Sequence, residues 1–129
     1  MRMFEEQIIV SKHDLDELNH VNNIIYIKWI LGVAKKHWKK LVSNEITNNY
    51  YWILLEHNIK YLHPAVINDK IRINTYIQNT EEVKSNRIVE IYNKETNKLL
   101  VTSETKWCLI DAKKNRPCRI PNEIRKAFT

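Results

Sequence analysis

The stretch DLDELNHVNNIIYIKWIL, residues 14–31, decides how this chain folds. Its first half is polar and carries Asp14, Asp16 and His20, whereas its second half is almost continuously apolar. The apolar half begins a pattern of three- and four-residue spacings that predicts an amphipathic helix. The positions in this pattern are Ile24, Ile27, Leu31, Ala34, Trp38 and Leu41. A polar loop that runs directly into a helix places its side chains beside the free N–H groups and positive dipole end of that helix.

Three further apolar residues, Tyr26, Ile30 and Val33, widen this stripe until the helix is apolar on most sides. Such a helix is usually wrapped by the rest of the protein. The other segments alternate polar and apolar residues with the period of two that is typical of strands. We expect strands at residues 3–10, 55–61, 71–77, 83–92 and 99–110.

The connections between the later strands are short, which implies an antiparallel sheet. Because Gly32 is the one glycine, asparagine must supply the left-handed turn positions, and we predict turns at Asn68-Asp69 and Asn79-Thr80. The 129 residues contain no internal repeat and suit a single domain, residues 1–129. We therefore predict an α+β fold in which an antiparallel sheet of about five strands curls around one long helix. The open face and edges of such a sheet are left for another subunit to cover.

Composition excludes several classes of protein. Hydrophobic residues make up 43% and charged residues 28%, which is an ordinary globular balance. The longest apolar stretch, residues 24–34, contains Lys28 and is too short for a bilayer, and the acidic N-terminal segment does not fit a signal peptide. Cys108 and Cys118 suit a reducing compartment, so we expect a cytoplasmic protein. A chain with one glycine has no glycine-rich phosphate loop.

The net charge of +6 favours a polyanionic partner, either nucleic acid, the nucleotide of coenzyme A or an acidic carrier protein, or it simply keeps the protein soluble. Lys84 and Arg87 lie on a positively charged strand and could bind the phosphates of coenzyme A or phosphopantetheine, although a solvated strand face also explains them. Tyr26 and Trp29 have the helical spacing of core residues, and either could wall an acyl pocket.

The polar loop carries the candidate chemistry. A carboxylate beside the N-terminus of a helix can act as general base or nucleophile while the helix stabilises an oxyanion, which is the minimum equipment for acyl transfer. Asp16 is our candidate for that carboxylate, and His20 could orient the water or the carboxylate. For Asp14 we expect a capping role, and Asn22 and Asn23 are suitable helix caps. The histidines and acids of this loop lack the spacing of a metal site, so we expect neither metal nor cofactor.

With this loop in place before the helix, the chain resembles the hotdog-fold thioesterases, in particular the acyl–acyl-carrier-protein (acyl-ACP) thioesterases and the related single-domain acyl-CoA thioesterases. Three stretches carry the resemblance, and together they span nearly the whole chain. They are Asp14-Leu15-Asp16 with His20-Val21-Asn22-Asn23 and Tyr26, then Tyr61-Leu62-His63-Pro64-Ala65 leading through Asn68-Asp69 to Ile73, and the tail Arg116-Pro117-Cys118-Arg119-Ile120-Pro121.

The resemblance implies roles for particular residues. Asp16 matches the catalytic carboxylate of the family and His20 matches the histidine of the acyl-ACP thioesterase motif, while the backbone N–H of Asn23 matches the group that polarises the thioester carbonyl. Two positions depart from the plant enzymes. Leu18 stands where those enzymes have a catalytic asparagine, and Lys60 stands where they have a glutamate.

The activity implied by the resemblance is hydrolysis of an acyl-CoA or acyl-ACP thioester to a free acid and a thiol, in cytoplasmic fatty acid metabolism. The implied assembly is a homodimer or homotetramer, with no nucleic acid or membrane as partner. Two alternatives remain open at this point. One is a catalytically silent protein that binds acyl-CoA or acyl carrier protein. The other is a hotdog enoyl hydratase or dehydratase, although the expected acid on the helix is missing between Ile24 and Val42.

Overall fold

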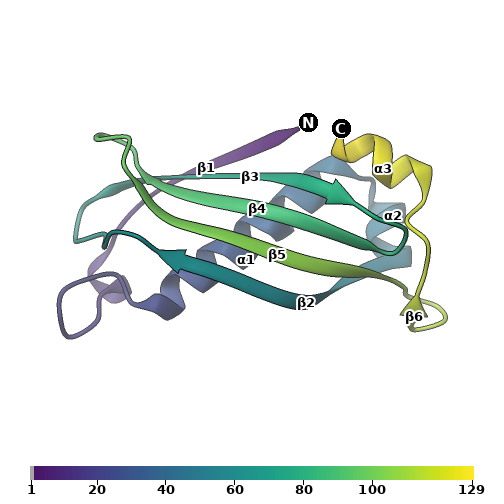
Figure 1. The fold of residues 1–129 in the computed structure, drawn as a ribbon, viewed down its shortest axis with the longest axis horizontal. Coiled ribbons are helices and arrows are strands. Elements are labelled where there is room, and N and C mark those ends of the chain that lie inside the picture. The colour runs from purple at the N-terminus through teal and green to yellow at the C-terminus, as the bar shows by residue number, and fades with distance from the viewer. Residues whose placement is uncertain (1) are drawn as a thin grey trace.

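The computed structural model describes residues 2–129 as a curled antiparallel sheet with one long helix along one face (Figure 1). The order of one strand, one long helix and four strands confirms the predicted fold class. In chain order, the elements are β1 (Met3–Ile9), α1 (Asn23–Leu41), α2 (Asn44–Asn49), β2 (Tyr50–Tyr61), β3 (Lys70–Thr80), β4 (Lys84–Asn93), β5 (Leu99–Asp111), β6 (Arg116–Pro117) and α3 (Asn122–Phe128), with a 3-10 turn at Lys12–Asp14.

The strands lie in the order β1-β3-β4-β5-β2, and every neighbouring pair is antiparallel. The short strand β6 pairs with the end of β5. Strands β1 and β2 are therefore the two edge strands of the five main strands of the sheet. Edge β1 is tied to the helix by an ion pair between Glu6 and Lys36, whereas β2 leaves Ile53 and Leu55 exposed at 44% and 47%.

Asparagine supplies the left-handed backbone positions, as the single glycine suggested. The non-glycine residues of positive φ within residues 2–129 are Asn19, Asn68, Asn97 and Asn115. The predicted turn at Asn68-Asp69 is confirmed. The predicted turn at Asn79-Thr80 is wrong, because both residues belong to β3 and the chain reverses between Thr80 and Lys84. Strand β2 also begins at Tyr50 rather than at Leu55.

The start of α1 is fixed by Asn22, whose side chain accepts a hydrogen bond from the backbone N–H of Ile24 at 3.0 Å. The predicted contact face of this helix is only partly right. Ile24 is 61% exposed, and the side buried against the sheet is instead the row Tyr26, Ile30, Val33, Ala34 and His37. Because the first half of α1 is apolar nearly all round, its spacing pattern does not reveal which side meets the sheet.

The interior contains two apolar clusters, one near each end of α1. The first includes Tyr26, Ile30 and Val33 of the helix, and the second includes Trp38 and Leu41. Between them, the helix-facing surface of the sheet carries polar side chains. These buried polar residues are Thr75, Ser85, Arg87, Ser103 and Thr105, with His37 of α1 above them.

Two short helices were not predicted. Helix α2 follows Ser43, whose side chain accepts from the N–H of Ile46, and α3 buries Ile124 and Phe128 in the second apolar cluster. Both close the end of the molecule where α1 stops (Figure 1). Within residues 2–129, no helix combines the length and the apolar character needed to cross a membrane.

Candidate active site

The loop before α1 is held by its own hydrogen bonds. The Asp14 carboxylate accepts from the backbone N–H and the hydroxyl of Ser11, at 2.9 and 3.2 Å, which is the capping role expected for this residue. The backbone of Asp16 donates to the carbonyl of His20 at 2.8 Å, and Leu15 forms a bridge with Val21. The candidate carboxylate therefore lies in a closed turn rather than in a loose loop.

The two oxygens of the Asp16 carboxylate have different environments. Oδ1 accepts hydrogen bonds from the backbone N–H groups of Leu18 and His20, at 2.8 and 3.2 Å. For Oδ2, the structure records no hydrogen-bond partner among residues 2–129. Leu18, at the position where the plant enzymes have asparagine, is 71% exposed. One oxygen thus orients the carboxylate, and the other is available for a proton or a reacting atom.

The first turn of α1 offers a hydrogen-bond donor close to this loop in the sequence. The N–H of Ile24 is satisfied by the Asn22 side chain, and the N–H groups of Ile25 and Tyr26 donate to the Asn22 carbonyl. The backbone N–H of Asn23 has no acceptor in the described part of the chain. Because it lies at the positive end of the helix dipole, this N–H is suited to hold an oxyanion.

Tyr26 connects α1 to the segment after β2. Its hydroxyl accepts a hydrogen bond from the backbone N–H of Ala65 at 3.0 Å, and its ring packs against Trp29 and Tyr61. Burial raises the pKa of Tyr26, and the negative charges of Asp69 and Asp16 add to the shift. The hydroxyl is therefore neutral and keeps a proton that it can donate.

His20 lies in the same turn. Its backbone N–H donates to the Asp16 carboxylate, and its carbonyl accepts from the backbone N–H of Asp16. Its side chain is exposed, and no hydrogen bond of its ring is recorded within residues 2–129. The structure thus links His20 to Asp16 through the His20 backbone, and it records no hydrogen bond between their two side chains within residues 2–129. No group of three or more histidine, cysteine or acidic side chains arranged to hold a metal ion is found in the described residues.

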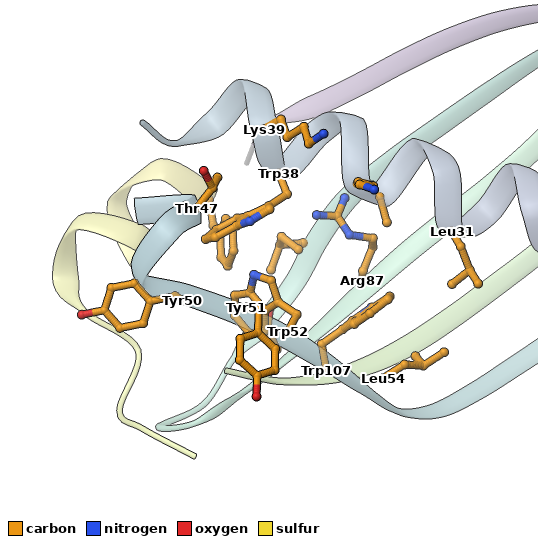
Figure 2. A pocket seen from close by; sticks show the side chains of 15 residues that line it. Leu31, Trp38, Lys39, Thr47, Tyr50, Tyr51, Trp52, Leu54, Arg87 and Trp107 are labelled. Atoms are coloured by element: carbon orange, nitrogen blue, oxygen red, sulfur yellow. The ribbon is translucent and has the colours of Figure 1, made fainter. Parts of the chain in front are cut away.

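A large cavity lies elsewhere, along the second half of α1 (Figure 2). Its volume of about 530 Å³ is within the range of small-molecule sites. Neither Tyr26 nor Trp29 lines it. Its walls come from α1, α2, β2, the middle of the sheet and α3, and they comprise Leu31, Ala34, Lys35, Trp38, Lys39, Thr47, Tyr50, Tyr51, Trp52, Leu54, Ile77, Ser85, Arg87, Trp107 and Phe128.

The structure separates Lys84 and Arg87, the two basic residues singled out on β4. Alternate residues of this strand face opposite sides of the sheet, and only Arg87 and its row face the helix. The Arg87 side chain is 4% exposed, and its Nη1 donates to His37 Nδ1 at 2.8 Å and to Thr75 Oγ1 at 2.9 Å. Burial lowers the pKa of Arg87 to about 10.

His37 is the functional candidate that sequence reasoning missed. Burial, followed by the charge of Arg87, lowers the pKa of His37 to about 4, so the ring is neutral and accepts the guanidinium N–H. Its ring also stacks on Phe4, with centroids 5.4 Å apart. A signal for this pair exists in the sequence, since His37 continues the helical spacing of Ile30 and Val33, and Arg87 shares the strand face of Val89.

Comparison with known proteins places the whole chain in one family. Residues 2–128 match the acyl-ACP thioesterase N-terminal domain. No curated protein matches the sequence. Among solved structures, a 1,4-dihydroxy-2-naphthoyl-CoA thioesterase, Slr0204 from Synechocystis, is 18% identical with a TM-score of 0.85, and the match covers 98% of this chain and 96% of that one.

Two other solved structures match this chain at similarly low identity. The protein SAV2348 from Staphylococcus aureus, solved in complex with CoA, is 18% identical, with a TM-score of 0.86 and coverage of 98% of this chain and 81% of that one. The 12:0-ACP thioesterase from Umbellularia californica is 13% identical, with a TM-score of 0.85 over 98% of this chain, but only 51% of that longer chain is matched. At these identities the structures show the fold.

The family match covers nearly all of the chain, and the matched structures superpose on it over most of its length. The chain therefore belongs to the acyl-ACP thioesterase N-terminal domain family and has the hotdog fold, and thioester hydrolysis is the class of reaction that this membership supports.

Proposed function

We propose that this protein hydrolyses an acyl thioester, carried on coenzyme A or on acyl carrier protein, with Asp16 as its catalytic carboxylate. The observation that supports the proposal is an oriented carboxylate in the turn before α1 and a backbone N–H in its first turn, since Oδ2 of Asp16 and the N–H of Asn23 have no partner among residues 2–129. These are the base and the oxyanion donor that acyl transfer requires.

In the proposed reaction, Oδ2 of Asp16 takes a proton from water as the water oxygen attacks the thioester carbonyl. The carbonyl oxygen becomes an oxyanion that accepts a hydrogen bond from the N–H of Asn23. When the tetrahedral intermediate collapses, the carbon–sulfur bond breaks and the thiolate takes the proton back from Asp16. Direct attack by the carboxylate, with hydrolysis of the resulting anhydride, uses the same two groups.

The remaining predicted site residues have supporting roles in this proposal. His20 orients the attacking water from the same turn, and Tyr26 and Trp29 wall the space beside the reacting carbon. Lys84 contributes to the positive surface that attracts the phosphates of the carrier. The net charge of +6 suits both coenzyme A and an acidic carrier protein, so it does not choose between them. We keep the cytoplasm as the expected location.

The active form is proposed to be a homodimer, or a tetramer built from such dimers, in which the β2 edges of two subunits pair. Ile53 and Leu55 are exposed on an unpaired edge strand, which proteins normally protect. Ile24 is exposed as well, on the side of α1 turned away from the sheet. A two-fold axis pairs identical patches, so two β2 strands would meet antiparallel.

This pairing would bring the cavity of one subunit toward Asp16 of the other. Strand β2 starts at the cavity, where Tyr50 and Trp52 line the wall, and ends at Tyr61, which packs on Tyr26 near the start of α1. When two such strands run antiparallel, the start of one lies beside the end of the other. Asp16 of the partner subunit would then approach the cavity of this one. We propose that each active site combines both subunits in this way.

The test of hydrolysis is a panel of acyl-CoA and acyl-ACP thioesters in which the released thiol is followed with a thiol-reactive dye. We expect the wild-type protein to hydrolyse members of the panel, and Asp16→Asn to lower kcat by about 10²–10⁴-fold, the usual contribution of a catalytic base. The amide oxygen can still accept from Leu18 and His20, so the turn is retained. The variant therefore removes the base without removing the loop.

The matched control is Asp14→Asn, which changes the other acid of the same loop and keeps an acceptor for Ser11. It should retain most of the activity. An Asp16→Asn protein as active as the wild type would exclude Asp16 from the mechanism. A wild-type protein that binds acyl-CoA but releases no thiol from any member of the panel would instead favour the silent acyl-binding alternative.

A further inference from the structure

The cavity contains a buried cation without a counter-ion. The Arg87 side chain is 4% exposed, and its two recorded partners, His37 and Thr75, are both neutral. No carboxylate within residues 2–129 forms a salt bridge with it. A buried charge that lacks a partner of opposite sign is costly, so proteins rarely keep one that nothing uses.

Part of the guanidinium is also without hydrogen bonds. Both recorded bonds use Nη1, and Nε–H and the Nη2–H groups have no acceptor in the described residues. Neither nitrogen is fully enclosed by protein atoms, so both have some contact with open space, and Arg87 lines the cavity. Figure 2 shows the Arg87 side chain rising from β4 toward α1 within the group of cavity residues. Nε–H and Nη2–H lie side by side on one edge of a guanidinium, the arrangement that binds a carboxylate with two parallel hydrogen bonds.

The rest of the cavity selects an apolar molecule. The indoles of Trp38, Trp52 and Trp107 surround the space, together with Leu54 (Figure 2). Phe128 of α3 also lines it. A strongly hydrated group such as a phosphate would lose its water among these walls, whereas a hydrocarbon or aromatic stem is stabilised by them. The site therefore fits a molecule with an apolar body and one compact anionic tip.

We propose that the cavity binds the acyl part of the substrate and that Arg87 binds a carboxylate at its far end, so that the preferred substrate is an ω-carboxyacyl thioester. The substrate class rests on the proposed thioesterase function, whereas the anion site itself does not. His37 and Thr75 act as positioning residues, because they hold Nη1 and leave the other edge of the guanidinium turned toward the ligand. Lys35 and Lys39 lie on α1 at the cavity wall, and both are exposed, so neither replaces the enclosed cation.

The anion site is tested first by binding, without any reaction. Calorimetry compares two probes of equal length with the wild-type protein, octanedioic acid monomethyl ester and methyl octanoate. We expect the carboxylated probe to bind at least about tenfold more tightly, because only its carboxylate can accept the charge-assisted hydrogen bonds of the guanidinium. Arg87→Met should abolish this difference, and Arg87→Lys should restore only part of it, because lysine lacks the planar pair of donors.

The matched control is Arg72→Met, which removes an arginine from the opposite face of the sheet, where it lies over the ring of Tyr92. This variant should keep the preference for the carboxylated probe. Equal binding of the two probes by the wild-type protein would overturn the anion site, and this measurement needs no variant to fold. A preference that survives in Arg87→Met would also overturn it, by assigning the preference to other cations.

Turnover then distinguishes the anion site from the proposed function. With octanedioyl-CoA and octanoyl-CoA, we expect kcat/KM of the wild-type protein to favour the carboxylated thioester at least about tenfold, and Arg87→Met to remove the preference mainly through KM. Equal hydrolysis of both thioesters would overturn the substrate assignment and leave the thioesterase standing. Tight binding of the carboxylated probe without hydrolysis of either thioester would overturn the thioesterase and leave the anion site.

Discussion

The two ends of α1 differ in what they could contribute to an acyl-transfer site: one offers reactive groups, and the other offers a binding cavity. At its start, the Asp16 carboxylate and the N–H of Asn23 each offer an atom without a hydrogen-bond partner among residues 2–129, and neither residue lines the large cavity. Along its second half lies a cavity of about 530 Å³ that holds Arg87 but no catalytic acid. The cavity residues on α1 begin at Leu31, eight residues and about 12 Å along the helix axis from Asn23.

If the proposed dimer forms, the active site is incomplete in the isolated chain. Its reactive groups and its binding space would meet only across the exposed β2 edge, where antiparallel pairing brings opposite ends together. The following predictions test whether these two regions belong to one site formed by two subunits, and what each region contributes.

The largest expected effect comes from mixing two inactive variants. Asp16→Asn removes the base, and Ala34→Phe places a ring into the cavity from α1, so each protein alone should be nearly inactive. If each site uses the base of one subunit and the cavity of the other, half of the sites in a mixed dimer are intact. Unfolding and refolding the two together in equal amounts should then restore about a quarter of the wild-type thioesterase rate.

Two measurements make this result decisive. Each variant refolded alone controls for recovery of the fold, and analytical ultracentrifugation checks that all samples contain dimers. If both regions served a site within one subunit, every subunit in the mixture would carry one defect. The mixture would then stay inactive, and the shared site would be refuted.

The two regions also differ in how readily they could be predicted. The Asp16 turn and the start of α1 are contiguous in the sequence, and a capping asparagine such as Asn22 acts on residues within one turn of itself. Local rules were therefore enough to predict the helix and to propose a candidate acid and backbone donor beside its start. The alternating strands were equally visible, and the short connections account for the neighbours β3, β4 and β5, but not for the pairing of β2 with β5 or of β1 with β3.

The cavity could not be predicted in the same way, because its walls come from seven helices and strands that are spread along the chain. Arg87 and His37 are 50 residues apart and meet only through tertiary packing. Helix α3 was missed because seven residues are too few for a clear helical pattern, although Ile124 and Phe128 have the spacing of one face. The side of α1 that meets the sheet was also misassigned, since a helix that is apolar nearly all round has no unique buried face.

The second prediction concerns the N–H at the start of α1. Asn23→Pro deletes that donor while keeping the helix, because proline is favoured at the first helical position and Asn22 already has the extended backbone that proline requires before it, with φ −64° and ψ 139°. We expect kcat to fall by about 10²–10³-fold, the loss found when one oxyanion donor is removed. Steady-state kinetics with a saturating acyl thioester measures this change.

Asn23→Ala provides the comparison, because it changes the side chain and keeps the backbone donor. Its kcat should fall far less than that of Asn23→Pro. Circular dichroism verifies that both variants keep α1. If the proline variant keeps its full rate with an intact helix, the oxyanion is held elsewhere, and the start of α1 loses its catalytic role.

The smallest expected effect is a pH dependence of the free energy of unfolding, caused by His37 in the second half of α1. The pKa of His37 is lowered from 6.5 to about 4 by burial and by Arg87, so below pH 6.5 the unfolded chain binds a proton that the folded protein does not. The free energy of unfolding should therefore rise with pH between about 4 and 6.5 and be independent of this group at higher pH, with a change of about 2–3 kcal/mol.

Urea unfolding at a series of pH values tests this, with His37→Phe as the comparison. Phenylalanine keeps the stack on Phe4 but has no proton to exchange, and the lost acceptor for Arg87 lowers stability by the same amount at every pH in this range. The slopes, rather than the absolute stabilities, then isolate His37. Burial also lowers the pKa of His57, which remains in both proteins, so its contribution cancels. Identical slopes for the two proteins would mean that folding does not change the pKa of His37. His37 would then be protonated beside Arg87 below about pH 6.5. The guanidinium would then face a second cation, and the cavity would need an anion even in the absence of substrate.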